Sequence, residues 1–216
     1  MKDILLINVF GEDKPGVTSA VTNVLSFYDA TVLDIGQAVI HQQLNLGLLT
    51  LVPSEADKEA LVSQVQSCAA NLHMRVKFLP ISEQDYQQWV DQQGKSRHIV
   101  TLLARKIEAQ HLAALTEVVS QYQLNIDKII RLSGRINLHE SDQLGRACVE
   151  FSVRGEASDP HAFKKSLLEL AHQYDIDIAF QEDNIFRRNR RLVVFDMDST
   201  LIDEEVIDEL AIEAGV

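Results

Sequence analysis

The sequence is poor in cysteine, proline and glycine, and it contains no long apolar run. Its two cysteines, Cys68 and Cys148, cannot build a disulfide framework and do not have metal-ligand spacing. With only 4 prolines and 9 glycines among 216 residues, a collagen-like or low-complexity chain is excluded. No apolar stretch approaches the roughly 20 residues of a bilayer span, and no signal-peptide cleavage site follows the apolar residues near the N-terminus. We therefore expect a globular, cytoplasmic protein with reduced cysteines.

Positive charge is scarce as well. Lysine and arginine together number 20, against 32 aspartates and glutamates, so the formal net charge is -12 at pH 7. Nucleic acids and anionic membrane surfaces attract the opposite sign, so neither is an expected partner. The remaining composition, 46% hydrophobic and 24% charged, is ordinary for a folded domain. At roughly 150 residues per domain, the length allows one large domain or two small ones.

The first part of the chain alternates between strand and helix periods. Asp3 to Phe10 is apolar like a strand, and from Val17 onward apolar residues recur at helical spacing. The pattern then predicts two strands, a helix and a last strand, at 30–41, 44–53, 54–71 and 73–81. The resulting order, β-α-β-β-α-β, is the ferredoxin-like plan of an α+β fold.

The same order recurs in the second part of the chain. Its strands are predicted at 97–106, 124–132, 145–153 and 176–181, and its helices at 109–122 and 159–174. Tyr28 matches Tyr122 at a spacing of 94, and Phe78 matches Phe180 at a spacing of 102. The larger spacing places an insertion between the two middle strands, at 133–144. A repeat of this kind predicts two copies of one small domain.

The turn after the first predicted strand runs from Gly11 to Val17 and ends in Pro-Gly before the helix. Together with the duplicated plan, this turn resembles the ligand turn of ACT domains, regulatory modules that usually bind an amino acid between copies. Glycine lets a ligand approach the backbone, and a helix N-terminus offers free N–H groups to a carboxylate. The resemblance covers about residues 3–182. The residues that it implies in binding are Asp13, Pro15, Gly16, Val17 and Thr31.

A Pro-Gly pair is also common in turns that only connect a strand to a helix. For the first copy, the sequence therefore allows either a ligand-binding turn or a purely structural one. If a ligand binds, Asp13 meets its ammonium group, and serine or glycine is the expected effector. The matching turn of the second copy, Arg105 to Gln110, has neither proline nor glycine. We therefore expect the second turn to serve packing.

Two linkers are predicted, at 82–96 and 183–191. The first holds Tyr86 and Trp89 at helical spacing, which favours a short helix packing its aromatic side chains against a domain. The second carries four arginines, and we interpret it as a solvated linker rather than a phosphate-steering patch.

The end of the chain carries the most specific motif. Four apolar residues, 192–195, predict a buried strand, and Asp196 and Asp198 follow where that strand ends. Alternation places both carboxylates on one side, which suits a divalent cation. We expect Asp203 to cap a helix that runs to Ala214. The predicted buried stripe of that helix comprises Val206, Ile207, Leu210 and Ala211.

This motif resembles the first motif of the haloacid dehalogenase superfamily of phosphotransferases. The longer string from Asp196 to Ile202, with Glu205 and the run from Ile207 to Val216, looks like phosphoserine phosphatases of the longer bacterial type, which carry tandem ACT domains. The resemblance implies Mg²⁺-assisted hydrolysis of O-phospho-L-serine, the last step of serine biosynthesis. The first strand and helix of a haloacid dehalogenase-like α/β domain are thus expected here.

The resemblance also implies a role for each matching residue. Asp196 is the nucleophile, which forms an aspartyl-phosphate, and it also binds Mg²⁺. Asp198 is the acid and base, and its backbone carbonyl is the second Mg²⁺ contact. The N–H of Met197 holds phosphoryl oxygens, and Glu205 binds the ammonium group of the substrate.

The predicted organisation is an ACT domain at 1–81, a linker at 82–96, an ACT domain at 97–182, a linker at 183–191 and a phosphatase stub at 192–216. The other catalytic motifs of the family do not occur in these residues, so we expect a truncated chain that is inactive alone. The alternative is a free-standing tandem-ACT regulator that senses an amino acid. A pure regulator has no reason to carry Asp196 to Thr200. Either protein is expected to form a homodimer.

Overall fold

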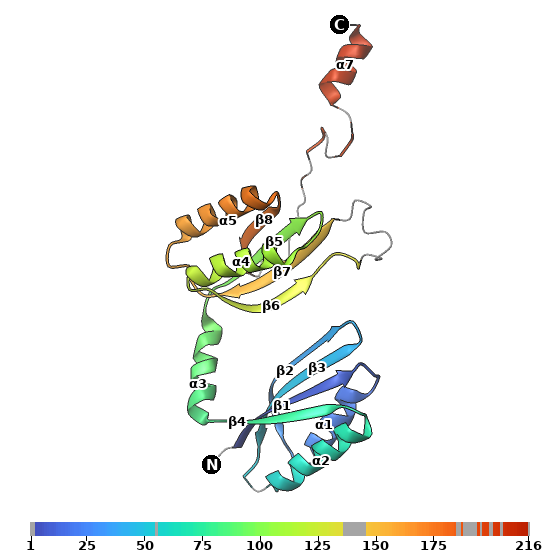
Figure 1. The fold of residues 1–216 in the computed structure, drawn as a ribbon, viewed down its shortest axis with the longest axis vertical. Coiled ribbons are helices and arrows are strands. Elements are labelled where there is room, and N and C mark those ends of the chain that lie inside the picture. The colour runs from blue at the N-terminus through green and yellow to red at the C-terminus, as the bar shows by residue number, and fades with distance from the viewer. Residues whose placement is uncertain are drawn as a thin grey trace. The chain divides into compact units, whose positions relative to one another are not determined.

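The structure is a computed structural model that describes residues 3–54, 56–135, 146–184, 187, 194, 196–198, 201–203 and 205–215 (Figure 1). The chain divides into two compact units, Met1–Gly94 and Lys95–Val216. Each unit has the order β-α-β-β-α-β and one four-stranded antiparallel sheet. The predicted ferredoxin-like plan is therefore confirmed in both copies. Among the helices so described, none has the length and apolar character needed to cross a membrane.

The first unit consists of four strands and two helices before its connector. In chain order they are β1 (Asp3–Glu12), α1 (Val17–Phe27), β2 (Thr31–Ile40), β3 (Gln43–Val52), α2 (Lys58–Asn71) and β4 (Arg75–Ile81). The sheet order is β2-β3-β1-β4. Alternate residues of β1, such as Leu5 and Ile7, are buried against Val21 and Leu61 of the helices. We call the other sheet face, which carries Leu6 opposite Leu49, the open face.

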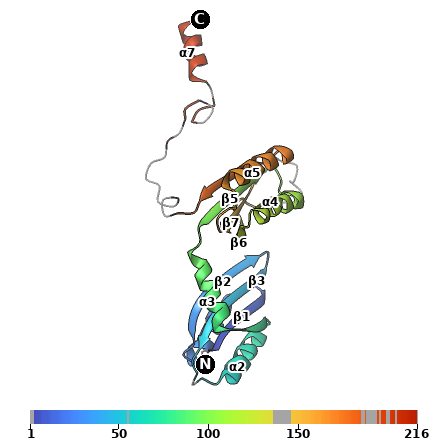
Figure 2. The ribbon, with the colours of Figure 1, turned by 90° about the vertical axis from the view of Figure 1, so that its left-hand side faces the viewer.

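The second unit repeats the arrangement. Its elements are β5 (Arg97–Ala104), α4 (Ala109–Gln121), β6 (Asn125–Arg131), β7 (Ala147–Arg154), α5 (Pro160–Tyr174) and β8 (Asp177–Glu182), in the sheet order β6-β7-β5-β8. Figure 2 shows α4 and α5 on the same side of this sheet. Its open face carries Thr101 opposite Glu150. The predicted insertion falls between β6 and β7, and its residues 136–145 lie outside the described residues.

The two copies keep the predicted spacing in their backbone geometry. The first helix of each copy is followed by a residue with positive φ, Asp29 in one and Gln123 in the other, 94 positions apart. The second helix is followed in the same way by His73 and Asp175, 102 positions apart. A left-handed residue after a helix ends it and turns the chain back toward the sheet. The repeat therefore extends to the way each helix ends.

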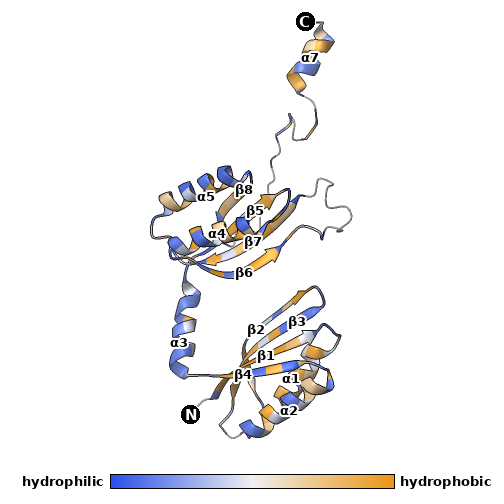
Figure 3. Cartoon of the chain, in the orientation of Figure 1, coloured by the Kyte–Doolittle hydropathy of each residue, from blue (hydrophilic) through white to orange (hydrophobic). Residues whose placement is uncertain are grey.

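A short helix, α3 (Glu83–Asp91), and the 3₁₀ turn η1 (Gln92–Gly94) follow β4. The α3 helix is mostly hydrophilic (Figure 3), but its Tyr86 and Trp89 rings lie 5.9 Å apart and are half-buried. With Leu6 and Leu49 they line a cavity of about 340 Å³ on the open face of the first sheet. The first linker is thus the helix with packed aromatic residues that its spacing predicts.

The second linker departs from its prediction at one residue. Arg187 is mostly buried and forms ion pairs with Glu150 and Asp183. The interpretation of a solvated linker is therefore wrong for Arg187, because two carboxylates of the second unit hold it. The other three arginines of this linker lie outside the described residues.

Candidate functional site

The turn between β1 and α1 leaves the N-terminus of the helix uncapped by a side chain. Gly16 is the N-cap residue, with φ of 91°, and no side chain accepts a hydrogen bond from the first turn of α1. The first N–H groups of a helix have no partner within the helix, and the helix dipole makes this end partly positive. Gly16 is exposed, while Val17 after it is buried. The geometry suits a small anion such as a carboxylate.

Contacts on both sides fix the conformation of this turn. A Cβ on Gly11 would lie 2.8 Å from the Sδ atom of buried Met74, so a larger residue here would displace the Met74 side chain. The backbone N–H of Asp13 donates to the carbonyl of Gln42 at 2.8 Å. The Thr18 hydroxyl donates to Oε1 of Gln37 in β2 at 2.7 Å. The helix N-terminus is therefore held in place before any ligand arrives.

The structure brings some predicted ligand residues together and leaves one apart. Asp13 and Pro15 are exposed in the same turn as Gly16. Thr31 begins β2 and pairs with Leu51, the residue that also pairs with Ile4 near the start of β1. Thr31 thus lies at the opposite end of the sheet from the turn. Within one copy it cannot complete the same site.

The corresponding helix N-terminus of the second copy is occupied by its own side chains. Glu108 is the N-cap residue of α4, and Glu108 and His111 form a reciprocal capping box. The N–H of Glu108 donates to Nδ1 of His111 at 3.2 Å, and His111 is 7% exposed. Sequence reasoning missed this pair, although a side chain three residues after an N-cap is the spacing of a capping box. The expectation that this turn serves packing stays a prediction, but its helix end is closed.

Of the acidic motif, the structure describes Asp196, Met197 and Asp198. The Met197 N–H donates to Oδ1 of Asp196 at 2.9 Å. Oδ1 of Asp198 accepts the N–H of Val206 at 3.1 Å, which joins the motif to the start of the next helix. The carbonyl of Met197 accepts hydrogen bonds from two residues of the intervening turn, Leu201 and Ile202. The predicted strand at 192–195 lies, apart from Val194, outside the described residues.

The last helix, α7 (Val206–Ala214), begins later than predicted. Its N-cap residue is Glu205, not Asp203, so the expectation for Asp203 is wrong. The helix N-terminus instead receives the carboxylate of Asp198 through Val206. Its apolar residues Ile207 and Leu210 are exposed, so the predicted buried stripe is not covered by any part of the chain that the structure describes. Glu205 lies at the helix start, seven positions after Asp198.

The acidic motif contains carboxylates that could bind a divalent cation. Across the described ranges, no three or more His, Cys, Asp or Glu side chains gather in a way that could hold a metal ion. Asp196 and Asp198 alone supply carboxylate oxygens, which are the donors that Mg²⁺ prefers, and Mg²⁺ commonly binds one or two protein carboxylates with water and phosphate. The donor chemistry of these two residues therefore fits Mg²⁺.

Comparison with known protein families matches both copies. Residues 3–79 match one ACT domain model, and residues 96–181 match a second ACT domain model. Among solved structures, an unknown protein from Galdieria sulphuraria aligns over 85% of this chain and 100% of its own, with a TM-score of 0.67 and 13% identity. At that identity the likeness concerns the fold alone.

Two curated relatives match nearly the whole chain. A phosphoserine phosphatase of Streptomyces coelicolor is 31% identical over 211 residues, covering 98% of this chain and 48% of its own length. The phosphoserine phosphatase SerB2 of Mycobacterium tuberculosis is 33% identical over 217 residues, with the same two coverages. The chain thus spans about half the length of the curated relatives it matches. Because 98% of the chain is covered, Asp196 and Asp198 lie inside both alignments.

Proposed function

We propose that this chain, a tandem ACT-domain protein, is the amino-acid-responsive part of a phosphoserine phosphatase and carries the first catalytic segment of that enzyme. One observation carries the proposal. Two ACT domains and the Asp196-x-Asp198 segment occur in one chain, inside alignments with proteins named phosphoserine phosphatase. A free-standing ACT regulator is the second candidate, because the open N-terminus of α1 needs no catalytic segment to bind a ligand.

The proposed effector site is the turn of the first copy. The carboxylate of serine or glycine would accept hydrogen bonds from the free N–H groups at the start of α1, where nothing lies within 4 Å of the Cβ position of Gly16. The Asp13 carboxylate would pair with the ammonium group. Thr31, at the far end of its own sheet, would contribute only from another copy of the domain. Serine, as the product of the reaction, would then report its own abundance.

The proposed chemistry uses the two aspartates in different roles. A carboxylate oxygen of Asp196 attacks the phosphorus of phosphoserine, the P–O bond to serine breaks, and an aspartyl-phosphate forms. Asp198 gives a proton to the departing serine oxygen. Water then attacks the phosphorus, Asp198 takes the proton back, and the P–O bond to Asp196 breaks to release phosphate. The Val206 N–H, bound to one oxygen of Asp198, would orient that carboxylate for both transfers.

Mg²⁺ is the proposed cofactor, held in part by Asp196 and by Asp198. When bound, it offsets the repulsion between a carboxylate and a phosphate dianion. Glu205 would bind the substrate ammonium group, and its place at the N-terminus of α7 keeps it close in sequence to Asp198. The Met197 N–H would turn from Asp196 to a phosphoryl oxygen when substrate is present.

Calorimetric titration of L-serine and glycine into the chain tests the effector site. We expect saturable binding, weakened at least about tenfold by Asp13→Asn, because a charge-assisted hydrogen bond is lost. The matched control is Asp177→Asn, the same substitution at an exposed position of the second copy, which should leave the affinity unchanged. Absence of heat with either amino acid would remove the effector from the proposal.

Phosphoserine hydrolysis with Mg²⁺ tests the catalytic segment. The 216-residue chain by itself should give no turnover, since it offers only two of the needed carboxylates. In a protein that joins this chain to a second half like that of its relatives, Asp196→Asn should lower kcat by roughly a thousandfold or more. Full activity of that variant would rule out Asp196 as the nucleophile. Serine binding by an inactive longer protein would favour the free-standing regulator.

A further inference from the structure

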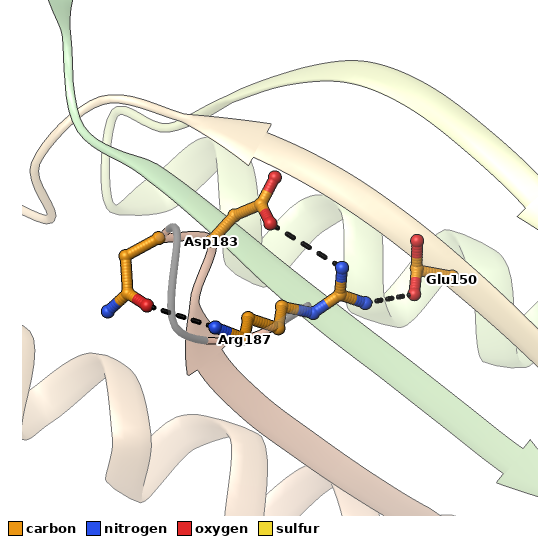
Figure 4. Close-up of polar contacts among 4 residues, drawn as sticks. Glu150, Asp183 and Arg187 are labelled. Carbon is orange, nitrogen blue, oxygen red and sulfur yellow. Dashed lines mark hydrogen bonds and ion pairs between the residues drawn. The ribbon is translucent and has the colours of Figure 1, made fainter. Parts of the chain in front are cut away.

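The chain that leaves the second sheet is attached to its open face by one arginine. Nη2 of Arg187 lies 2.6 Å from Oε2 of Glu150, and Nη1 lies 3.4 Å from Oδ1 of Asp183 (Figure 4). The side chains of all three are less than 20% exposed. A guanidinium group bridges two carboxylates with separate nitrogens, which a single ammonium group does less well. This cluster, Glu150, Asp183 and Arg187, is called here the arginine clamp.

The backbone of Arg187 is fixed as well as its side chain. Its N–H donates to Oδ1 of Asn184 at 3.2 Å and approaches the carbonyl of the same residue at 3.1 Å. The N–H of Asp183 donates to the carbonyl of Arg97 at 2.9 Å, which extends the pairing of β5 with β8. The clamp therefore holds a short turn of chain directly after the last strand.

The first copy has the same turn with different chemistry. Ser82 accepts the N–H of Asp85 at 3.0 Å, and Ser82 and Asp85 lie 102 positions before Asn184 and Arg187. There, however, Gly47 stands at the position of the open face where the second copy has Glu150, so no carboxylate is available at that position. The ion pairs are thus a feature of the copy that precedes Asp196, and not of the repeat in general.

We propose that Arg187 is a positioning residue that ties the segment bearing Asp196 to the second ACT domain through Glu150. The proposal rests on the proposed function of Asp196. Asp196 lies nine positions after Arg187 and fourteen after Glu182. With the clamp closed, Asp196 therefore stays within about 32 Å of the clamp, whereas with the clamp open the chain would allow about 50 Å from the end of β8. Because a mostly buried charge that loses its partner is strongly disfavoured, the clamp is either closed or fully released. A change at the open face that reaches Glu150 therefore changes how far Asp196 can move.

Hydrogen exchange of single amides in the 216-residue chain tests the clamp itself. Glu150→Gln removes the charge and keeps the shape, so it should speed exchange at the Arg187 amide by at least about tenfold, as expected from the loss of a charged hydrogen bond. The matched control is Glu169→Gln, which breaks an exposed pair with Lys165 and should leave that amide unchanged. Equal exchange in Glu150→Gln and the unchanged chain would overturn the clamp.

A second variant guards against a merely structural effect. Arg187→Lys keeps the charge but cannot bridge both carboxylates, so it should give an intermediate exchange rate. At the Asp183 amide, the double variant Arg187→Gln/Glu150→Gln should exchange no faster than Arg187→Gln alone, since the ion pair with Glu150 is already broken in the single variant. Independent, additive effects would mean that the two side chains do not act together, and would contradict the proposal.

Distances between spin labels test the positioning without any phosphatase activity. One label is placed at the exposed position Glu117 of α4 and one at Asp208 of α7, after Cys68 and Cys148 are replaced by serine. Glu150→Gln should shift the distance distribution to longer values, and Glu169→Gln should not. An unchanged distribution would overturn the positioning role. Because no turnover is measured, this result is separate from success or failure of the phosphatase proposal.

Discussion

The two copies share one plan and differ in the chemistry at equivalent positions. Three pairs show the difference: the first buried helix position, the bulge in the edge strand and one site on the open face. The first copy has Val17, Leu33 and Gly47 at these places, and the second has His111, Asp127 and Glu150. The fold therefore accepts polar side chains at positions where the other copy has none.

Each polar residue of the second copy has a partner within reach. His111 accepts the Glu108 N–H, Asp127 lies 3.0 Å from Arg154, and Glu150 lies 2.6 Å from Arg187. A partly buried polar group without a partner costs stability, so each substitution is tolerated together with its partner. The first copy thus keeps a helix N-terminus open, whereas the second copy uses its polar groups to hold its own segments together.

The cores differ in the same sense. In the described part of the first copy, the fully buried hydrophobic residues are aliphatic, while the second copy buries Phe151 and Phe163. The Phe163 ring packs edge-on against Tyr122 at 5.3 Å and Phe180 at 5.2 Å. Such edge-to-face pairs add to the stabilisation that burial alone provides. The stability of the second core therefore depends strongly on the Phe163 ring, whereas no single aromatic ring has this role in the described core of the first copy.

The largest predicted effect on stability is that of Phe163→Ala, which should destabilise the second copy and leave the first unchanged. Phe163→Ala should lower the free energy of unfolding of the second copy by about 3–5 kcal/mol, because it leaves a cavity among aromatic rings. The single tryptophan, Trp89, belongs to the first unit, so its fluorescence reports that unit while circular dichroism reports both. In urea, the circular dichroism transition should shift and the Trp89 transition should stay. A joint shift would show that the copies unfold as one.

A matched substitution in the first copy checks that the effect comes from burial. Phe27 is 83% exposed at the end of α1, and Phe27→Ala should change the free energy of unfolding by at most about 0.5 kcal/mol. Loss of several kcal/mol in this variant would mean that Phe27 is covered in solution by a surface outside the described residues.

Most of the fold could be predicted from the sequence because its signals are local. Residues such as Val21 and Leu25 recur at helical spacing, and the same spacing returns 94 positions later, so element order and duplication follow from pattern alone. The Pro-Gly pair likewise locates the open turn before α1. Local periodicity is sufficient because burial of one helix face or strand face decides these elements.

The paired polar groups could not be predicted in the same way. Glu150 and Arg187 lie 37 positions apart, and nothing in either neighbourhood says which of the many acids faces this arginine. The start of α7 was predicted wrongly for a related reason. Positions 203–205 are three consecutive acids, each a possible first-turn or cap residue. The helix begins after Glu205, whose carbonyl accepts the N–H of Glu209, and Asp198 from outside this run accepts the N–H of Val206. Long-range contacts decide these choices, and spacing does not record them.

A smaller effect is expected where the helix ends differ. Glu108→Ala removes the N-cap side chain of α4 and should lower the free energy of unfolding of the second copy by about 1 kcal/mol. The control Glu117→Ala, at an exposed position in the middle of the same helix, should change it by only a few tenths of a kcal/mol. Urea denaturation followed by circular dichroism measures both. Equal effects in the two variants would mean that the capping box contributes nothing beyond helix propensity.

The smallest predicted effect concerns the bulge of the second edge strand. Asp127→Asn keeps the size of the side chain but removes the charge that faces Arg154, whose side chain is 12% exposed. Since Asp127 itself is partly exposed, the expected loss is only about 0.5–1 kcal/mol and should shrink as salt is added. The equivalent residue Leu33 has no charge to lose, so the first copy should show no matching salt dependence. The free energy of unfolding lost in Asp127→Asn is measured at low and at high salt. An equal loss at both would mean that the charge pair with Arg154 does not stabilise the bulge.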